Sequence, residues 1–353
     1  MKKILSLLII LCLLLSGCVI EIPLAPANPT AGTEAVATDS EPFIVHYIDV
    51  GQADCILLEY NDQFMLIDGG NREDSQLVVS YLEQQGVQEL AAVVCTHAHE
   101  DHVGGLPSVL AVYPTAAVYA PTKTYSSKIF DKFVYYTDQQ GLEITIPQPG
   151  DSFTLGDVAL TVLGPVKSYP DPNNTSIVIM AEFGTTRFLF TGDMEKEAEN
   201  DMLDHWGEKY NWNCDVLKSG HHGSSTSSSY RLIYEADPEY IVISVGTDNT
   251  YGHPHKETIA LYKDAGIPAF RTDELGHVII TSDGSTVSII WEKQNAQPED
   301  VEAADLSYIG NKNSKKLHLS TCSGLPKAEN QVTFDNYEEA IAAGYTPCSS
   351  CMG

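Results

Sequence analysis

Basic side chains are scarce in this sequence of 353 residues. Lys and Arg together number 20 against 48 for Asp and Glu, which gives a formal net charge of -28. A protein that holds nucleic acid tightly without regard to sequence needs clustered Lys and Arg to neutralise phosphates. The composition therefore argues against that class of protein.

Long apolar runs are confined to the N-terminus. Residues 1–18, MKKILSLLIILCLLLSGC, combine two early lysines, an apolar stretch and small residues before Cys18. The pattern is typical of a secretion signal, and its ending resembles the bacterial lipobox, in which cleavage leaves the cysteine as a lipid-modified N-terminus. We expect a lipoprotein signal peptide over 1–18 and a mature chain anchored through Cys18 to the extracytoplasmic face of the cell membrane. A membrane span is disfavoured because the uncharged run is at the short limit for crossing a bilayer.

Hydrophobic periodicity is missing from residues 19–41, which are rich in Pro, Ala and Thr. Such a composition predicts a disordered tether. The remaining chain, 42–353, is long enough for one large domain and one small one.

From residue 42 onward, strand-like runs alternate with helical segments. Strands are predicted within 43–60, 63–68, 90–95, 143–191, 214–220, 239–246 and 269–292, and helices near 73–86, 125–140, 195–207 and 256–266. The order has two strand-rich halves, so we predict an α/β fold over 42–293 with two sheets between helices rather than one doubly wound sheet. The polar segment 224–230, SSTSSSY, is expected to be a flexible, solvated loop in its later residues.

The densest group of ionisable side chains directly follows the apolar strand predicted at 90–95. It consists of His97, His99, Asp101 and His102. Alternate side chains that leave a buried strand point into one pocket. Imidazoles and a carboxylate are good ligands for Zn²⁺ or Mn²⁺, and four such groups exceed what one tetrahedral ion with an open position requires. The pattern therefore predicts two metal ions.

Further candidate ligands follow other predicted strands. Asp193 leaves an apolar strand directly after a glycine and is the best candidate for a carboxylate that bridges two metals. His221 and His222 follow the strand at 214–220, and His253 lies in a later loop. Buried structural histidines rarely produce such a convergence of His and Asp at four strand ends.

The pattern HxHxDH at 97–102, followed by Asp193, resembles the metallo-β-lactamase fold family of binuclear hydrolases over 42–293. A finer similarity is to the extracytoplasmic hydrolase domain of the ComEC DNA-uptake proteins. Its characteristic segments have counterparts here in DVGQADC at 49–55, NTSIV at 174–178, GD at 192–193, HHGS at 221–224 and HP at 253–254. The resemblance implies an αββα sandwich.

The resemblance also implies the metal ligands. His97 and His99 would hold one metal, Asp101 and His102 the other, and Asp193 would bridge them. With both ions bound, a bridging water would ionise near neutral pH and serve as the nucleophile. Asp101 would also orient that nucleophile through its second oxygen.

A histidine of the HHGS segment would complete the second metal site. We favour His221, although the sequence does not decide between it and His222. The other histidine and His253 would face the substrate, where His222 or His253 would stabilise or protonate the leaving oxygen. Ser224, next to the histidines, is expected to donate to a phosphate oxygen.

A third histidine for the first metal is absent. Many members of the wider fold supply one between the HxHxDH segment and the bridging Asp, but none occurs here between His102 and Asp193. Asn174 and Ser176 occupy that region and are our candidates for a role at the site. A first site with fewer imidazoles makes Mn²⁺ as plausible as Zn²⁺.

These features predict a membrane-anchored, metal-dependent phosphodiesterase or nuclease that acts on DNA first, with protein partners left open. Two alternatives remain. One keeps the site and changes the substrate to a small, cell-wall or lipid phosphodiester of the phosphocholine or teichoic-acid type, or to a lactone. The other, of a different class, is a non-catalytic binding lipoprotein.

Cysteines are sparse except near the C-terminus. After an acidic linker at 294–305, the segment 306–353 contains His318 and Cys322 followed by a CxxC motif at Cys348 and Cys351. Two ligand pairs of this kind describe a closed structural zinc site, which so small a domain needs for stability. The alternative is a disulfide between Cys348 and Cys351 outside the cell.

This segment resembles the metal-binding module of Ada-type DNA repair proteins, through AAGYTPCSSC at 342–351 and VTFDNYEEA at 332–340. It departs from that module at His318, where Ada has a cysteine, so we expect an α+β binding module rather than a methyl acceptor. Its lysines at 312, 315, 316 and 327 form either a DNA-contacting face or an ordinary solvated surface.

Overall fold

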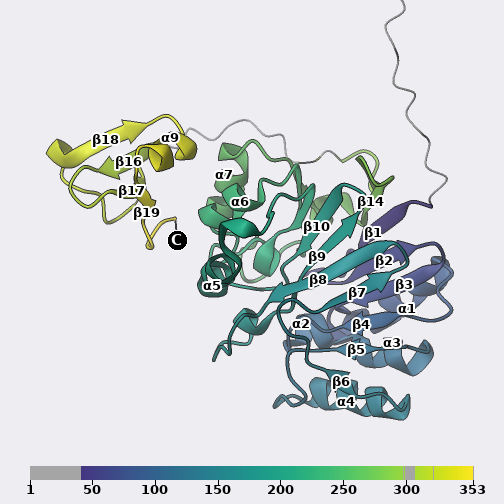
Figure 1. The fold of residues 1–353 in the computed structure, drawn as a ribbon. Helices are drawn as coiled ribbons and strands as arrows, with labels where there is room; N and C mark the ends of the chain where they lie inside the picture. The colour runs from purple at the N-terminus through teal and green to yellow at the C-terminus, as the bar shows by residue number, and fades with distance from the viewer. Residues whose placement is uncertain (1–40, 297, 299–306, 321, 353) are drawn as a thin grey trace, which may run out of the picture. The chain divides into compact units, whose positions relative to one another are not determined.

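The computed structural model describes residues 41–296, 298, 307–320 and 322–352 (Figure 1). The predicted signal peptide, the lipidated Cys18, nearly all of the tether and most of the linker lie outside these residues. Within the described ranges, no helix has the length and hydropathy needed to cross a membrane.

The first of two large sheets has eight strands in the order β15-β14-β1-β2-β3-β4-β5-β6. Its strands are β1 (Phe43–Tyr47), β2 (Ile56–Tyr60), β3 (Gln63–Ile67), β4 (Ala92–Val94), β5 (Val118–Tyr119), β6 (Ile144–Thr145), β14 (Val278–Ser282) and β15 (Val287–Trp291). Strands β3 to β6 run parallel, so their carboxyl ends meet at one edge.

The second sheet has seven strands in the order β13-β12-β11-β10-β9-β8-β7. They are β7 (Ser152–Leu155), β8 (Val158–Gly164), β9 (Val178–Phe183), β10 (Thr186–Phe190), β11 (Val216–Lys218), β12 (Tyr240–Ile243) and β13 (Ala269–Arg271). Strands β10 to β13 are parallel.

Helices cover the outer face of each sheet (Figure 1). The first sheet packs against α1 (Ser75–Gln84), α3 (Leu106–Val112) and α4 (Lys128–Gln139), and the second against α5 (Lys196–Trp206), α6 (Tyr230–Ala236) and α7 (Lys256–Asp264). Short elements complete the domain: α2 (Glu100–Val103), α8 (Thr272–Leu275) and the 3-10 helices η1 (Arg72–Asp74), η2 (Asn173–Thr175), η3 (Gly207–Lys209) and η4 (Gly220–Gly223).

Alternation along the strands explains the layers. In β3, Met65 and Ile67 join the core between the sheets, whereas Leu66 faces the helices of the first sheet. In β12, Val242 faces the inter-sheet core and its neighbour Ile241 faces the helices of the second sheet. Because successive side chains point to opposite faces, a strand covered on both sides must be apolar throughout. The predicted αββα sandwich is confirmed.

The solvated loop predicted for the later residues of 224–230 is wrong. Ser227, Ser228 and Ser229 are buried, and the backbone N–H groups of Ser228 and Ser229 donate to the buried carboxylate of Glu199 in α5. Ser229 also caps α6 by accepting a hydrogen bond from the Leu232 N–H. A partner distant in sequence satisfies these polar groups, which is why composition alone mislabels the segment.

The C-terminal segment forms its own four-stranded sheet in the order β18-β16-β17-β19. Its elements are β16 (Tyr308–Asn311), β17 (Lys316–Leu319), η5 (Ala328–Asn330), β18 (Gln331–Phe334), α9 (Tyr337–Ala342) and β19 (Thr346–Pro347). This mixture agrees with the small α+β module expected from the sequence.

Candidate metal centre

The predicted ligands converge at the carboxyl ends of parallel strands from both sheets. His97, His99, Asp101 and His102 follow β4, Asp193 follows β10, and His222 follows β11. Strand ends of this kind are where α/β sheets collect ligands, because the parallel chains deliver side chains to one edge.

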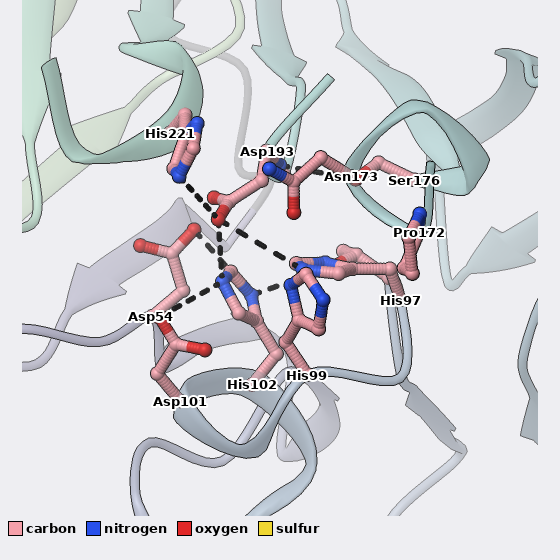
Figure 2. Close-up of polar contacts among 12 residues, drawn as sticks. Asp54, His97, His99, Asp101, His102, Pro172, Asn173, Ser176, Asp193 and His221 are labelled. Carbon is pink, nitrogen blue, oxygen red and sulfur yellow. Dashed lines mark hydrogen bonds and ion pairs between the residues drawn. The ribbon is translucent and has the colours of Figure 1, made fainter. Parts of the chain in front are cut away.

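Four of these side chains form a compact cluster. The ligand atoms of Asp101, His102, Asp193 and His222 all lie within 4.8 Å of one another. Asp193 Oδ2 lies 3.2 Å from His102 Nε2 and 3.6 Å from His222 Nε2. Asp101 Oδ2 lies 3.3 Å from His222 Nε2. Figure 2 shows Asp193 facing the rings of His102 and His97.

The cluster fits a divalent metal. Within the described part of the chain, His102 Nε2, His222 Nε2 and Asp193 Oδ1 are buried and make no hydrogen bond, so their close approaches are not directed donor and acceptor pairs. Buried polar atoms without partners are costly unless an ion or water satisfies them. Burial opposes ionisation of Asp193, but His102 and His222 lower its pKa well below the usual range, which leaves a carboxylate ready to bind a cation.

The first predicted metal site, at His97 and His99, has fewer candidate ligands than the second. His97 Nε2 lies 3.0 Å from His99 Nδ1 and 3.9 Å from Asp193 Oδ2. Burial, and then the neighbouring His102, lower the pKa of His97 well below its usual value, so its imidazole is the neutral form that metals bind. Two imidazoles and one shared carboxylate leave a tetrahedral ion one ligand short.

Asn173 is the side chain placed to make up that deficit. It lies in η2, lines the same cavity as His99 and Asp193, and carries a buried Oδ1 without a hydrogen-bond partner among the described residues (Figure 2). The sequence analysis predicts the next residue, Asn174, for this role. The Asn174 Oδ1 instead accepts from the Glu195 N–H at 3.0 Å. The direction of side chains in a short 3-10 turn is not readable from sequence.

The geometry favours His222 over our choice of His221 as the ligand of the second site. His222 is 1% exposed and belongs to the four-residue cluster. His221 Nε2 lies 3.7 Å from Asp193 Oδ2, but its Nδ1 lies 3.4 Å from a Glu195 carboxylate oxygen, and its ring is 5.4 Å from that of His253. His221 and His253 therefore lie on the side of the site where we expect the substrate. The sequence analysis gives this place to His253 and to whichever of His221 and His222 is not a ligand.

Of the other two predicted polar residues, Ser176 positions a ligand and Ser224 does not reach the cavity. The Ser176 hydroxyl accepts from the Asp193 N–H at 3.0 Å and so holds the bridging carboxylate in place. Ser224 accepts from the Thr226 N–H and lies within hydrogen-bonding distance of the Thr226 hydroxyl. Ser224 is buried and does not line the cavity, so the structure gives no support to a phosphate contact from its hydroxyl.

Two buried acids that sequence reasoning missed support the ligands. Asp68, which ends β3, accepts from the His102 Nδ1–H at 2.8 Å and from both the backbone and the hydroxyl of Thr96. Asp54 lies 2.9 Å from Lys218 Nζ and 3.4 Å from His222 Nδ1. Burial opposes ionisation of Asp54, but Lys218 and then His222 lower its pKa to about 2. Such carboxylates fix the ring orientation of ligating histidines. The sequence signal for Asp68 is its position directly after β3, whereas Asp54 precedes β2 and has no such signal.

The cluster opens into a cavity of about 320 Å³. Gln52, Glu100, Asn173 and Tyr251 line it together with the histidines and acids of the site. Burial and the neighbouring His221 lower the pKa of His253 to about 4, so its ring is neutral near pH 7. Gln52 Nε2 lies 3.3 Å from His253 Nδ1. Asp101 and His221 are partly exposed, so a solvent-borne substrate can reach them.

A second ligand cluster lies in the C-terminal module. The ligand atoms of His318, Cys322, Cys348 and Cys351 lie within 4.8 Å of one another, with His318 Nδ1 3.4 Å from Cys322 Sγ. The cysteines are free, so the structure does not contain the disulfide alternative between Cys348 and Cys351. One imidazole and three thiols at this spacing fit a structural Zn²⁺.

Comparison with known families agrees with both clusters. Residues 48–246 match the metallo-beta-lactamase superfamily, and residues 292–352 match the metal binding domain of Ada. The chain therefore belongs to the metallo-beta-lactamase superfamily, whose members are generally metal-dependent hydrolases, and it carries an Ada-type zinc-binding domain at its C-terminal end.

Among individual proteins, the chain is similar to ComE operon protein 3 of Bacillus subtilis (strain 168), with 31% identity over 255 residues that make up 66% of this chain and 32% of that protein. Recombination protein 2 of Haemophilus influenzae is 29% identical over 233 residues, 63% of this chain and 27% of that protein. Competence protein ComA of Neisseria gonorrhoeae is 28% identical over 229 residues, 65% of this chain and 30% of that protein. The chain thus spans about a third of the length of these curated relatives.

Proposed function

We propose that the chain is a two-metal phosphodiesterase with DNA as its first substrate. The observation that carries the proposal is the cluster of Asp101, His102, Asp193 and His222 beside a cavity, in which His102 Nε2, His222 Nε2 and Asp193 Oδ1 are buried without a hydrogen-bond partner among the described residues. His97 and His99 lie beside it. Similarity to ComE operon protein 3 and to competence protein ComA supports DNA over other phosphodiesters.

Zn²⁺ or Mn²⁺ ions in these sites would lower the pKa of water and neutralise charge on a phosphoryl oxygen. His97, His99, Asn173 and Asp193 would hold one ion, and Asp101, His102 and His222 the other, together with Asp193. Ser176 and Asp68 keep Asp193 and His102 in position through the hydrogen bonds described above.

The remaining polar groups of the cavity suit recognition of a phosphate. When Gln52 donates to His253 Nδ1, the ring carries its proton on Nε2, which is then free to donate to a phosphate oxygen. His221 stands across from it at the cavity mouth. Both groups lie beside the ligand cluster, so they can orient the scissile ester and stabilise its leaving oxygen.

A second candidate substrate is a small phosphodiester from the cell wall or a lipid. The formal net charge of -28 favours it, because a strongly acidic chain repels a long polyanion. We further propose that the lipoprotein signal anchors the chain through Cys18 at the extracytoplasmic face of the membrane, where either substrate would be met.

The test combines metal content with hydrolysis. The chain from residue 42 onward is purified, its Zn and Mn are counted, and labelled single- and double-stranded DNA and a chromogenic bis-phosphodiester are assayed. Asp193→Ala is compared with Asp131→Ala, which removes an exposed acid of α4 instead. We expect Asp193→Ala to abolish cleavage and Asp131→Ala to retain it. A wild-type protein that carries metal only in the C-terminal module and cuts neither substrate would overturn the proposal.

A further inference from the structure

A second cavity adjoins the metal centre and is not explained by hydrolysis itself. Its volume is about 500 Å³. Ala98, which stands between the candidate ligands His97 and His99, lines it, and so do Pro172 and Thr175, which lie on either side of Asn173 and Asn174. Residues 97–99 and 172–175 therefore contribute both to the metal centre and to this cavity. We call it the proline groove.

The walls of the proline groove are stiff and present flat or apolar surfaces. Six prolines line it, at positions 121, 147, 149, 165, 170 and 172. Proline fixes φ, so these walls lose little conformational freedom when a ligand binds. Tyr125 lies in the wall with its ring 6.4 Å from that of His99, and Ile146 leaves 42% of its surface exposed there.

Free positive charge is missing from the groove. Among the described residues that line it, Lys167 is the one cation, and its Nζ lies 2.6 Å from Asp201 Oδ2 and 3.4 Å from Glu197 Oε1. The Tyr169 hydroxyl donates to the same Asp201 carboxylate. A surface of this kind does not follow a phosphate backbone, which needs unpaired Lys or Arg. It suits the neutral face of a planar ring.

We propose that the proline groove binds unpaired bases of a short single strand, next to the phosphodiester that lies at the metal centre. The inference rests on the proposed function, and it narrows the substrate class from DNA in general to short single strands with unpaired bases. The partly exposed ring of Tyr125 can stack on any base without reading its sequence, and proline and isoleucine surfaces cover the rest of the base. A duplex keeps its base faces stacked inside the helix and presents two charged backbones, so it gains nothing from this groove.

Binding is measured separately from cleavage. The probe is a fluorescently labelled phosphorothioate trimer of thymidine, and its Kd for the intact chain is followed by fluorescence anisotropy at low and high salt. Because stacking dominates, we expect the Kd to change little with salt, whereas a protein that makes many phosphate contacts loses affinity steeply. A hairpin duplex of the same base content should not displace the trimer.

Variants locate the binding. Tyr125→Ala should raise the Kd about tenfold, as expected for the loss of one stacked base, and Tyr125→Phe should keep it near the wild-type value. Ile146→Glu should also weaken binding, because it places a carboxylate beside the strand. The matched controls are Tyr135→Ala and Val112→Glu, since both side chains are 54% exposed and lie outside the groove.

The outcomes separate this inference from the proposed function. If the wild type cuts a chromogenic phosphodiester but does not bind the trimer, or binds the duplex equally well, the groove inference is overturned and the phosphodiesterase stands. Equal effects of Tyr125→Ala and Tyr135→Ala also overturn it. If the trimer binds through Tyr125 and Ile146 while no phosphodiester is cut, the groove inference holds and the proposed function fails.

Discussion

At the scale of single residues, the first metal site raises the question whether Asn173 is one of its ligands. His97 and His99 share Asp193 with the second site, and the unpartnered Oδ1 of Asn173 lines the same cavity. We predict that Asn173→Ala lowers the affinity of the first metal and that Asn173→Asp restores or strengthens it, because a carboxylate is the stronger oxygen ligand. Competition with a chelator of known affinity, read as metal per chain, measures the change.

The neighbouring Asn174 supplies the control for this prediction. Asn174→Ala removes the acceptor of the Glu195 N–H, which should cost about 1 kcal/mol of unfolding free energy without emptying the first site. Equal metal loss in Asn173→Ala and Asn174→Ala would mean that Asn173 acts through the shape of η2 and not as a ligand.

Asp68 is the clearest case of a residue that acts through another. Its carboxylate holds His102 Nδ1 at 2.8 Å and is itself held by Thr96. Asp68→Asn keeps the size of the side chain but weakens control over the tautomer of His102, so we expect about a 10- to 100-fold loss of second-site metal affinity. Metal titration of this variant is compared with Asp62→Asn in the exposed turn between β2 and β3. An unchanged affinity in Asp68→Asn would contradict the positioning role.

The ligand residues themselves were within reach of sequence reasoning, because a histidine or aspartate directly after a buried strand has few directions to point. The choice between adjacent residues was not. His221 and His222 both adopt left-handed backbone angles, with φ of 47° and 53°, and Asn173 and Asn174 share a 3-10 turn. In a 3-10 turn neighbouring side chains point about a third of a turn apart, and only tertiary contacts decide which one enters the cavity.

At the scale of elements, hydrogen bonds between α5 and the buried serines 227–229 hold the backbone that carries His221 and His222. Glu199 accepts from the N–H groups of Ser228 and Ser229 at 2.5 and 2.8 Å, and the Ser228 hydroxyl accepts from the Gly220 N–H at 3.1 Å, at the start of η4. We predict that Glu199→Ala lowers the unfolding free energy by about 1–3 kcal/mol, since it leaves buried N–H groups unpaired. Urea denaturation measures this loss. Glu197→Ala in the first turn of α5, where the side chain is exposed, is the control.

Glu199 also makes a pH prediction. Burial raises its pKa above the ordinary value of 4.5, so the folded chain binds this proton more tightly than the unfolded chain. The resulting stabilisation is complete below pH 4.5 and is lost as the pH rises through the folded-state pKa. The stability of the wild type relative to Glu199→Gln, measured by urea denaturation between about pH 4 and pH 8, should therefore fall as the pH rises. A constant difference would show that Glu199 is not protonated above its ordinary pKa.

The elements that sequence reasoning missed have a common cause. Helix α3 follows Gly104 and Gly105 and contains Pro107, a combination that is typical of a loop. In the structure these glycines are required by contact, because a Cβ on Gly105 would collide with the Gly69 carbonyl oxygen. The serine segment is polar for a similar reason, since it meets Glu199. Long-range packing sets both features, and local composition does not report it.

At the scale of the whole molecule, the net charge and the chemistry of the metal centre lead to different expectations about the substrate. The proposed two-metal centre would act on a phosphodiester, whereas a net charge of -28 opposes the approach of any long polyanion. The short, unpaired strand that we propose would reconcile the two, because it carries few phosphates and offers exposed base faces to the proline groove. The same balance explains why sequence composition excluded a tight nucleic-acid binder without excluding an enzyme that acts on nucleic acid.

The C-terminal module should depend on its own metal. Its sheet is small, and its four ligands lie within 4.8 Å of one another. Domains of this size rarely bury enough apolar surface to fold alone, so zinc binding supplies much of the folding free energy.

We predict that Cys348→Ser unfolds the module and that Ser349→Ala, inside the same CxxC loop, does not. Limited trypsin digestion with mass spectrometry measures the rate of cleavage at Lys312, Lys315, Lys316 and Lys327, which we expect to rise when the surrounding chain unfolds. A reductant alone should not increase cleavage, since the cysteines are free. Equal resistance of Cys348→Ser and the wild type would contradict the zinc site, and sensitivity of the wild type to reductant would restore the disulfide in its place.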